Sequence, residues 1–314
     1  MDFNGTGRTD IISGSWPGEL YLFRRNANGT FAAGEKIKDK DGKPLKPGSA
    51  SVPFAFDWRN TGKLDLICGT VEGKVLLYVN EGTAKEPAYG KPVAVEADGK
   101  EILAPHGDSG PVVADWDGDG KPDLILGCGD GSVVWYRNIG TRSEPKLAKA
   151  ETLIPAPKQD EVKDDEDPPE TKECPHGTRA KVCVADFNGD GRPDLLVGDF
   201  AMKYGPKPKL TDEDKKEQIK LRKDAEEIQK KLEPYYNEVR EVYTAHEKKK
   251  DATEKDQKEL ETKVEEIAKK FKKELDEQRV VYEKLRKYER PYEYIGSVWV
   301  YLRKPGEKAG AVPR

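Results

Sequence analysis

The residues best placed to do chemistry form a nine-residue loop, DWDGDGKPD, at Asp115–Asp123. Aspartates occupy positions 1, 3, 5 and 9 of this loop, and Gly118 and Gly120 let the backbone curl so that the carboxylates converge. Converging carboxylates repel one another unless a hard cation lies between them, and oxygen-rich loops of this kind suit Ca2+. The loop continues into an apolar run, Leu124–Gly127, which is typical of a buried strand. The sequence therefore predicts a calcium loop that leads into a strand.

The chain contains three further copies of this unit. They are DFNGTGRTD at Asp2–Asp10, DWRNTGKLD at Asp57–Asp65 and DFNGDGRPD at Asp186–Asp194, followed by IISG, LICG and LLVG. The loops begin 55, 58 and 71 residues apart along the chain. Self-similarity on this scale indicates a repeat architecture.

The four loops differ in the metal ligands that they offer. The third loop offers Asp115, Asp117, Asp119 and Asp123 with the carbonyl of Lys121. The fourth offers Asp186, Asn188, Asp190 and Asp194 with the carbonyl of Arg192. The first offers Asp2, Asn4, Thr6 and Asp10 with the carbonyl of Arg8, and its lower charge predicts weaker binding.

The second loop carries Arg59 at position 3 and Thr61 at position 5. A guanidinium at that place would itself compensate Asp57 and Asp65, so we expect this loop to bind no metal. The alternative for all four loops is that they are Asx-rich turns without an ion.

Each repeat has the pattern of a small antiparallel sheet. One short strand enters the Asp loop (VPFAFD, GPVVAD, KVCVAD), a second leaves it, and a glycine-containing turn leads to a third strand. The third strands are expected at Glu19–Arg24, Lys74–Val79, Ser132–Arg137 and Gly296–Arg303. The residues that follow can supply a fourth, outer strand. Four antiparallel strands per repeat describe one blade of a β-propeller.

These loops and strands resemble the FG-GAP or VCBS repeats, the integrin-α-like propeller repeats. The resemblance implies a mainly β fold, with blades over residues 1–208 and 292–304 and Ca2+ in the loop between the first two strands of a blade. It also implies that the loops share one face and that ligands bind the opposite face. Repeat one lacks its first strand and repeat four ends after its third, so we expect a partial propeller, either an open fragment of a larger one or a strained ring of four blades. Because the chain begins inside a loop at Met1, we expect a truncated start, and the absence of an export signal says little about location.

Two insertions interrupt the repeats. Residues 155–175 are acidic and proline-containing, which predicts a mobile loop, and residues 305–314 are expected to form a disordered tail. Residues 209–291 carry two seams of apolar residues at coiled-coil spacing, one from Leu221 to His246 and one from Leu260 to Leu285 with Tyr282 in it. Two such seams joined by a short turn predict an antiparallel coiled-coil hairpin, inserted where other repeats have the turn between their second and third strands.

Both insertions fall on the face opposite the Asp loops, and we take this face as the one that binds a protein or carbohydrate ligand. Pro-His-Gly motifs place His106 and His176 on that face as candidate ligand contacts. A net charge of −4 argues against a nucleic-acid partner, and no apolar run is long enough to span a membrane. The coiled coil could also pair with another copy of the chain. A disulfide between Cys174 and Cys183 and unpaired thiols are both open.

Two classes of function remain. The first is a non-catalytic binding or scaffold module that calcium stabilises. The alternative is an extracellular polysaccharide lyase or hydrolase on a calcium-binding propeller, with His106 or His176 as its base. Because loops of modest affinity fill only where Ca2+ is plentiful, we expect an extracellular, periplasmic or cell-surface location.

Overall fold

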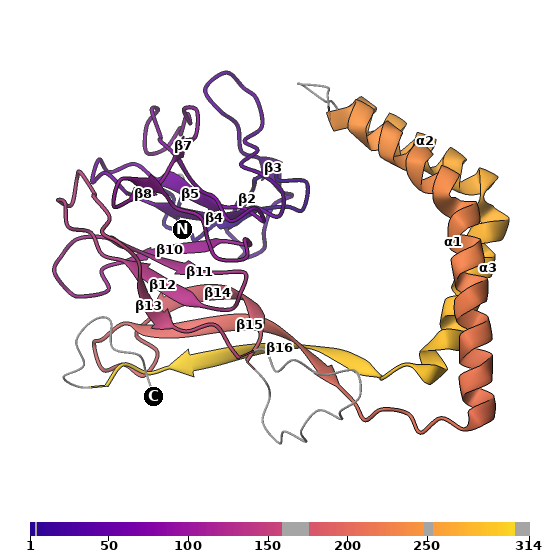
Figure 1. Cartoon of the computed structure of the whole chain (residues 1–314). Helices are drawn as coiled ribbons and strands as arrows, with labels where there is room; N and C mark the ends of the chain where they lie inside the picture. The colour runs from indigo at the N-terminus through magenta and orange to yellow at the C-terminus, as the bar shows by residue number, and fades with distance from the viewer. Residues whose placement is uncertain (4, 159–175, 248–253, 305–314) are drawn as a thin grey trace. The chain divides into compact units, whose positions relative to one another are not determined.

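The structure is a computed structural model that describes residues 1–3, 5–158, 176–247 and 254–304 (Figure 1). The chain divides into two compact units, one holding all the sheets and one holding the helices between Tyr204 and Glu293. The expected tail at 305–314 and most of the expected mobile loop, residues 159–175, lie outside the described residues. In the part that the structure describes, no helix has the length and apolar character needed to cross a membrane.

The first unit is built from antiparallel sheets that follow the four repeats. Sheets two and three each have four strands in sequence order, and sheets one and four each have three. The strands of sheets one and two are β1 (Ile11–Ser13), β2 (Tyr21–Phe23), β3 (Glu35–Lys36), β4 (Val52–Phe56), β5 (Asp65–Gly69), β6 (Val75–Tyr78) and β7 (Val93–Ala94). A two-stranded ribbon follows, β8 (Glu96–Ala97) and β9 (Lys100–Glu101). The strands of sheets three and four are β10 (Gly110–Ala114), β11 (Asp123–Gly127), β12 (Val133–Tyr136), β13 (Glu151–Ile154), β14 (Thr178–Ala185), β15 (Asp194–Tyr204) and β16 (Tyr292–Tyr301). Strand β16 begins before the expected Gly296, because the chain pairs with β15 as soon as it leaves the helical insertion.

Three hydrophobic cores lie between successive sheets. In β5, Leu66 belongs to the core shared with sheet one, whereas the next residue, Ile67, belongs to the core shared with sheet three. In β11, Leu124 faces sheet two and Ile125 faces sheet four in the same way. Alternate residues of a strand point to opposite faces, so these strands are buried on both sides and can be apolar throughout. This explains why each Asp loop runs into an uninterrupted apolar segment.

The second unit contains α1 (Asp212–Glu247), α2 (Glu254–Lys270), α3 (Lys272–Leu285) and a 3-10 turn, η1 (Arg286–Tyr288). Helix α1 packs against both α2 and α3. The pairing is antiparallel, because Gln218 near the start of α1 donates a hydrogen bond to the carbonyl of Tyr288, while Glu238 further along pairs with Lys270 at 2.9 Å. Thr211 begins α1 with a reciprocal cap. Its hydroxyl accepts the N–H of Asp214, and the Asp214 carboxylate accepts both the N–H and the hydroxyl of Thr211.

The helical seam differs from the expected one near its end. Leu221, Ala225 and Leu285 form a buried cluster, but the residue of α3 that packs against it is Val281, whereas Tyr282 is exposed. The helix is interrupted at Phe271, but Leu285 keeps its expected place in the cluster, so the difference is confined to one position of α3. The expectation of Tyr282 as a seam residue was therefore wrong by one position.

The described cysteines predict a simple labelling pattern. Cys68 and Cys128 are buried, and burial raises the pKa of both thiols, that of Cys128 to about 11, whereas Cys183 is exposed. Because the thiolate is the reactive form, we expect Cys183 of the native, reduced protein to react with iodoacetamide at least about 100-fold faster than Cys68 or Cys128. Peptide mass spectrometry after a timed pulse would measure this, with urea-unfolded protein as the control in which all thiols react. Fast labelling of Cys68 in the native state would contradict the two-sided burial of β5.

Candidate metal centre

The first aspartate of every loop holds the loop's own backbone. Asp2 accepts the N–H groups of Thr6 and Gly7, at 3.0 and 2.6 Å. The same bonds from loop positions 5 and 6 reach Asp57 and Asp186, and Asp115 accepts the N–H of position 6, Gly120, at 2.9 Å. The glycines in these loops adopt positive φ, for example +75° at Gly118, which lets the chain turn back towards the first carboxylate. Hydrogen bonds within the protein therefore hold the loop in its turned conformation, as in an Asx turn.

The last aspartate of every loop joins the loop to the sheet. Asp123 is fully buried at the start of β11, where it accepts the N–H of Trp116 at 3.2 Å and the N–H of Asn138 at 2.7 Å. Asp10 and Asp194 make the equivalent pair of bonds in the first and fourth loops. One carboxylate therefore ties the entry of the loop to the end of the third strand.

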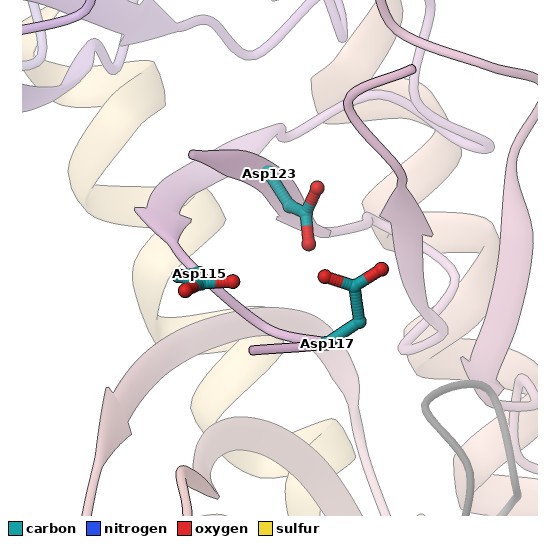
Figure 2. A group of neighbouring side chains, drawn as sticks. All are labelled: Asp115, Asp117 and Asp123. Atoms are coloured by element: carbon teal, nitrogen blue, oxygen red, sulfur yellow. The ribbon is translucent and has the colours of Figure 1, made fainter. Parts of the chain in front are cut away.

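The third loop brings three carboxylates together. Oxygens of Asp115, Asp117 and Asp123 lie within 4.8 Å of one another, and this is the one such group of acidic, histidine or cysteine side chains in the part of the chain that the structure describes. Figure 2 shows the three carboxylates pointing towards a common centre. Their burial is graded, from exposed Asp115 to fully buried Asp123. Burial raises the pKa of Asp123 against the lowering effect of its hydrogen bonds, so a cation beside it would relieve an unfavourable ionised state.

The fourth expected carboxylate of this loop, Asp119, is engaged elsewhere. Its side chain lies 2.9 Å from Lys121 Nζ, and the hydrogen bonds from Lys121 lower the pKa of Asp119 although its partial burial acts to raise it. Arg137 also approaches two carboxylates of this loop. Its Nε lies 2.6 Å from Asp117 Oδ2 and its Nη2 lies 3.6 Å from Asp119 Oδ2. The loop therefore already has a cation of its own, the Arg137 guanidinium at the end of β12.

The donor set of the third loop fits Ca2+. Three carboxylates, all oxygen donors, converge on one point, and Ca2+ prefers oxygen ligands in flexible geometry. Asp115, Asp117 and Asp123 would hold the ion, which would supply positive charge that fixes the loop. The carbonyl of Lys121 remains an expected ligand.

The second loop contains its own guanidinium, as the sequence indicated. Arg59 donates from Nε and Nη2 to the two oxygens of Asp65, each at 3.0 Å, and Asp65 is fully buried. This bidentate pair compensates the carboxylate that in the other loops accepts the N–H of position 2. Arg59 thus compensates Asp65 without an ion, and the absence of metal from this loop stays a prediction.

The first and fourth loops gather their ligands less closely. In the fourth, Asp190 accepts one hydrogen bond from the Asn188 side-chain amide and pairs with Arg192. In the first, the carboxylates of Asp2 and Asp10 accept backbone N–H groups, as their counterparts in the third loop do. Arg8 donates to the carbonyl of Arg25, and Asn4 lies outside the described residues. Metal binding by these two loops stays a prediction.

The two candidate histidines lie in different surroundings. His106 lines a polar hollow of about 260 Å³ with Asp108, Asp130 and Arg179, and Lys181 Nζ donates to Asp108 Oδ1 at 3.1 Å. His176 instead stacks on Trp299, with ring centroids 3.9 Å apart, and its Nδ1 lies 3.4 Å from the Tyr301 hydroxyl. In the described part of the chain, neither histidine belongs to a group that could hold a metal.

The sequence did not single out Arg137 or the hollow around Asp108. Arg137 could have been found from register, because it precedes Asn138, whose N–H bonds to the last aspartate of the same loop. The hollow combines turns from different repeats, so no sequence spacing indicates it.

These observations define a class of protein, a repeat protein in which an acidic loop leads into one strand of each antiparallel sheet. The FG-GAP-like repeat model matches residues 2–68 and 57–126, and the FG-GAP repeat model matches residues 179–199. The chain carries repeats of the FG-GAP family. Cartilage acidic protein 1 of Mus musculus is 30% identical over 135 residues, which are 41% of this chain and 20% of that protein. The Homo sapiens protein of the same name is 29% identical over 135 residues, and the chain spans about a fifth of these relatives, 20% and 19%.

Arg137 gives a test of the third loop. Its charge lies where it competes with a bound cation, so Arg137→Gln is expected to raise the affinity for Ca2+ about tenfold at low ionic strength. Isothermal titration calorimetry would measure the change. Lys149→Gln, an exposed substitution that also removes one positive charge, is the matched control and should leave the affinity nearly unchanged. An unchanged or weaker affinity in Arg137→Gln would show that the guanidinium does not compete with the ion.

Proposed function

We propose that this chain is a calcium-stabilised, propeller-like FG-GAP module that binds a protein or glycan ligand without catalysis. The convergence of Asp115, Asp117 and Asp123 carries the calcium part of the proposal. The FG-GAP repeats support the binding role, because they suggest a module of the binding or adhesion type. The two helical arms act as a projecting coiled coil that extends the reach of the module or pairs with another chain. Such a module works outside the cell or at its surface, where Ca2+ is abundant enough to fill loops of modest affinity.

The ligand would bind at the face opposite the Asp loops. The polar hollow supports this choice, because it presents carboxylates, a guanidinium and an imidazole within a small volume. Asp130 accepts the N–H and hydroxyl of Ser132 through Oδ1, at 2.9 and 2.6 Å, which orients its side chain. The Arg179 side chain is 61% exposed, with Nε 3.7 Å from Asp108 Oδ2. Oriented acceptors beside exposed donors suit the hydroxyl groups of a sugar or the polar groups of a peptide.

A glycan array tests the glycan half of the proposal. The purified full chain is applied in Ca2+ and in excess chelator, and we expect saturable binding that Asp130→Ala and Arg179→Ala reduce at least about tenfold. Glu144→Ala and Lys149→Ala, both exposed in one loop, are the matched controls. Absence of binding to every glycan would overturn the glycan half, and release of new saccharide ends from a bound glycan would favour the lyase or hydrolase instead.

A further inference from the structure

The sheets of this chain pack through one interface that is repeated between successive sheets. The residue at position 2 of each loop faces the next sheet, and in the first three loops it is buried: Phe3 is 3%, Trp58 6% and Trp116 5% exposed. Phe187 holds this position in the fourth loop and is 59% exposed. The fourth sheet therefore offers the same apolar contact with nothing described in the structure packed on it.

The third strand of the fourth sheet shows the same difference. Asn138 and Arg303 are equivalent, since each donates its N–H to the last aspartate of its loop. Counting back from them pairs Val133 and Trp135 of β12 with Val298 and Val300 of β16. The first two are 0% and 2% exposed, whereas Val298 and Val300 are 69% and 41% exposed. We call Phe187, Val298 and Val300 the trailing face.

The first sheet has the complementary open surface. The residue after the last aspartate of a loop faces the preceding sheet, and Leu66, Leu124 and Leu195 are 0%, 0% and 1% exposed at this position. Ile11 is its equivalent in β1 and is 46% exposed. We call this surface of sheet one, with Ile11 on it, the leading face. The chain thus presents both halves of the interface that it uses internally, one at each end of the series of sheets.

We infer that the trailing face of one copy of this chain docks on the leading face of a second copy. The contact would continue the packing that already joins the four sheets, with each partner supplying the half that the other lacks. Because the two halves differ, the contact is heterologous, and such contacts form a ring when the rotation between subunits closes. Two copies would bring together eight sheets, twice the four of one chain, which is within the range of closed propellers of about 4–8 blades. This inference is independent of the proposed ligand and of calcium.

Sedimentation velocity of the full chain over a range of concentrations tests the inference. We expect a species of twice the chain mass of 35.1 kDa that dissociates on dilution. Placing a carboxylate in the contact with Val298→Asp should weaken association at least about 100-fold, and Ile11→Asp at the opposite end should do the same. The two variants mixed should associate again through their one intact interface. Far-UV circular dichroism and a thermal melt check that each variant keeps its fold.

The control variants lie on the helices. Ile219→Asp and Val280→Asp introduce the same charge at exposed apolar positions of α1 and α3 and should leave the dimer intact. A wild-type chain that stays monomeric at the highest concentration would overturn the inference. So would a dimer lost in the helical variants but kept in Val298→Asp, or one weakened by Val298→Asp but unaffected by Ile11→Asp.

Discussion

Replacing Asp123 by alanine is expected to lower the free energy of unfolding by about 3–5 kcal/mol in metal-free buffer. The carboxylate is fully buried and accepts the N–H of Trp116 in the loop and the N–H of Asn138 after β12. These two hydrogen bonds join the loop to β12. Alanine leaves both donors without an acceptor at a position that water does not reach. The cost of burying the charge, which raises the pKa of Asp123, offsets only part of this loss.

Urea unfolding followed by tryptophan fluorescence measures this effect in the relevant unit. All five tryptophans lie in the sheet-containing unit, so the signal does not report the helices. Asp115→Ala is the matched control, because Asp115 is exposed and only its bond from Gly120 is lost, at a cost of about 1 kcal/mol or less. If Asp123→Ala lowers the free energy of unfolding by less than about 1 kcal/mol, the two hydrogen bonds to Asp123 do not stabilise the sheet.

Removing calcium is expected to lower the melting temperature of the sheet-containing unit by about 5–10 °C. A ligand that binds only the folded state at 100 times its dissociation constant contributes about 2.7 kcal/mol, and about 2–4 °C accompanies each kcal/mol in a unit of this size. The three carboxylates of the third loop repel one another, and the ion pair of Arg137 with Asp117 compensates only part of this charge. Ca2+ should restore the lost stability, whereas Mg2+ should not, because its small octahedral shell suits this loop poorly.

Two loop variants make the calcium experiment specific. Asp115→Asn combined with Asp117→Asn should abolish most of the shift, since the third loop loses two of its three converging charges. Asp57→Asn in the second loop should leave the shift unchanged, because Arg59 already compensates Asp65 there. A melting temperature that is the same in Ca2+ and in chelator would mean that the loops are ordinary turns, and the calcium part of the proposed function would be wrong.

Much of the candidate site was predictable because its residues are close in sequence. Aspartates at positions 1, 3 and 9 of a glycine-containing loop can approach one another whatever surrounds them, and Asp115, Asp117 and Asp123 do so. The pairing of Arg59 with Asp65 was equally local, six residues apart. The side chain of Asp119 was harder to place, because Lys121 within the loop and Arg137 beyond it both compete for its carboxylate.

The sequence by itself determined the repeat, the acidic loops with their apolar strands, and the helical insertion between β15 and β16, because each depends on periodic spacing within a few tens of residues. Only the tertiary structure decided which faces of these strands are covered. Ile125 and Leu196 follow loops of the same pattern and hold the same place in it, yet Ile125 is fully buried between sheets whereas Leu196 is only partly buried. The difference depends on whether another sheet packs against that face, and packing between distant segments leaves no mark in local spacing. The same holds for Arg137 and for the hollow around Asp108, where strand register and neighbouring turns place the charges.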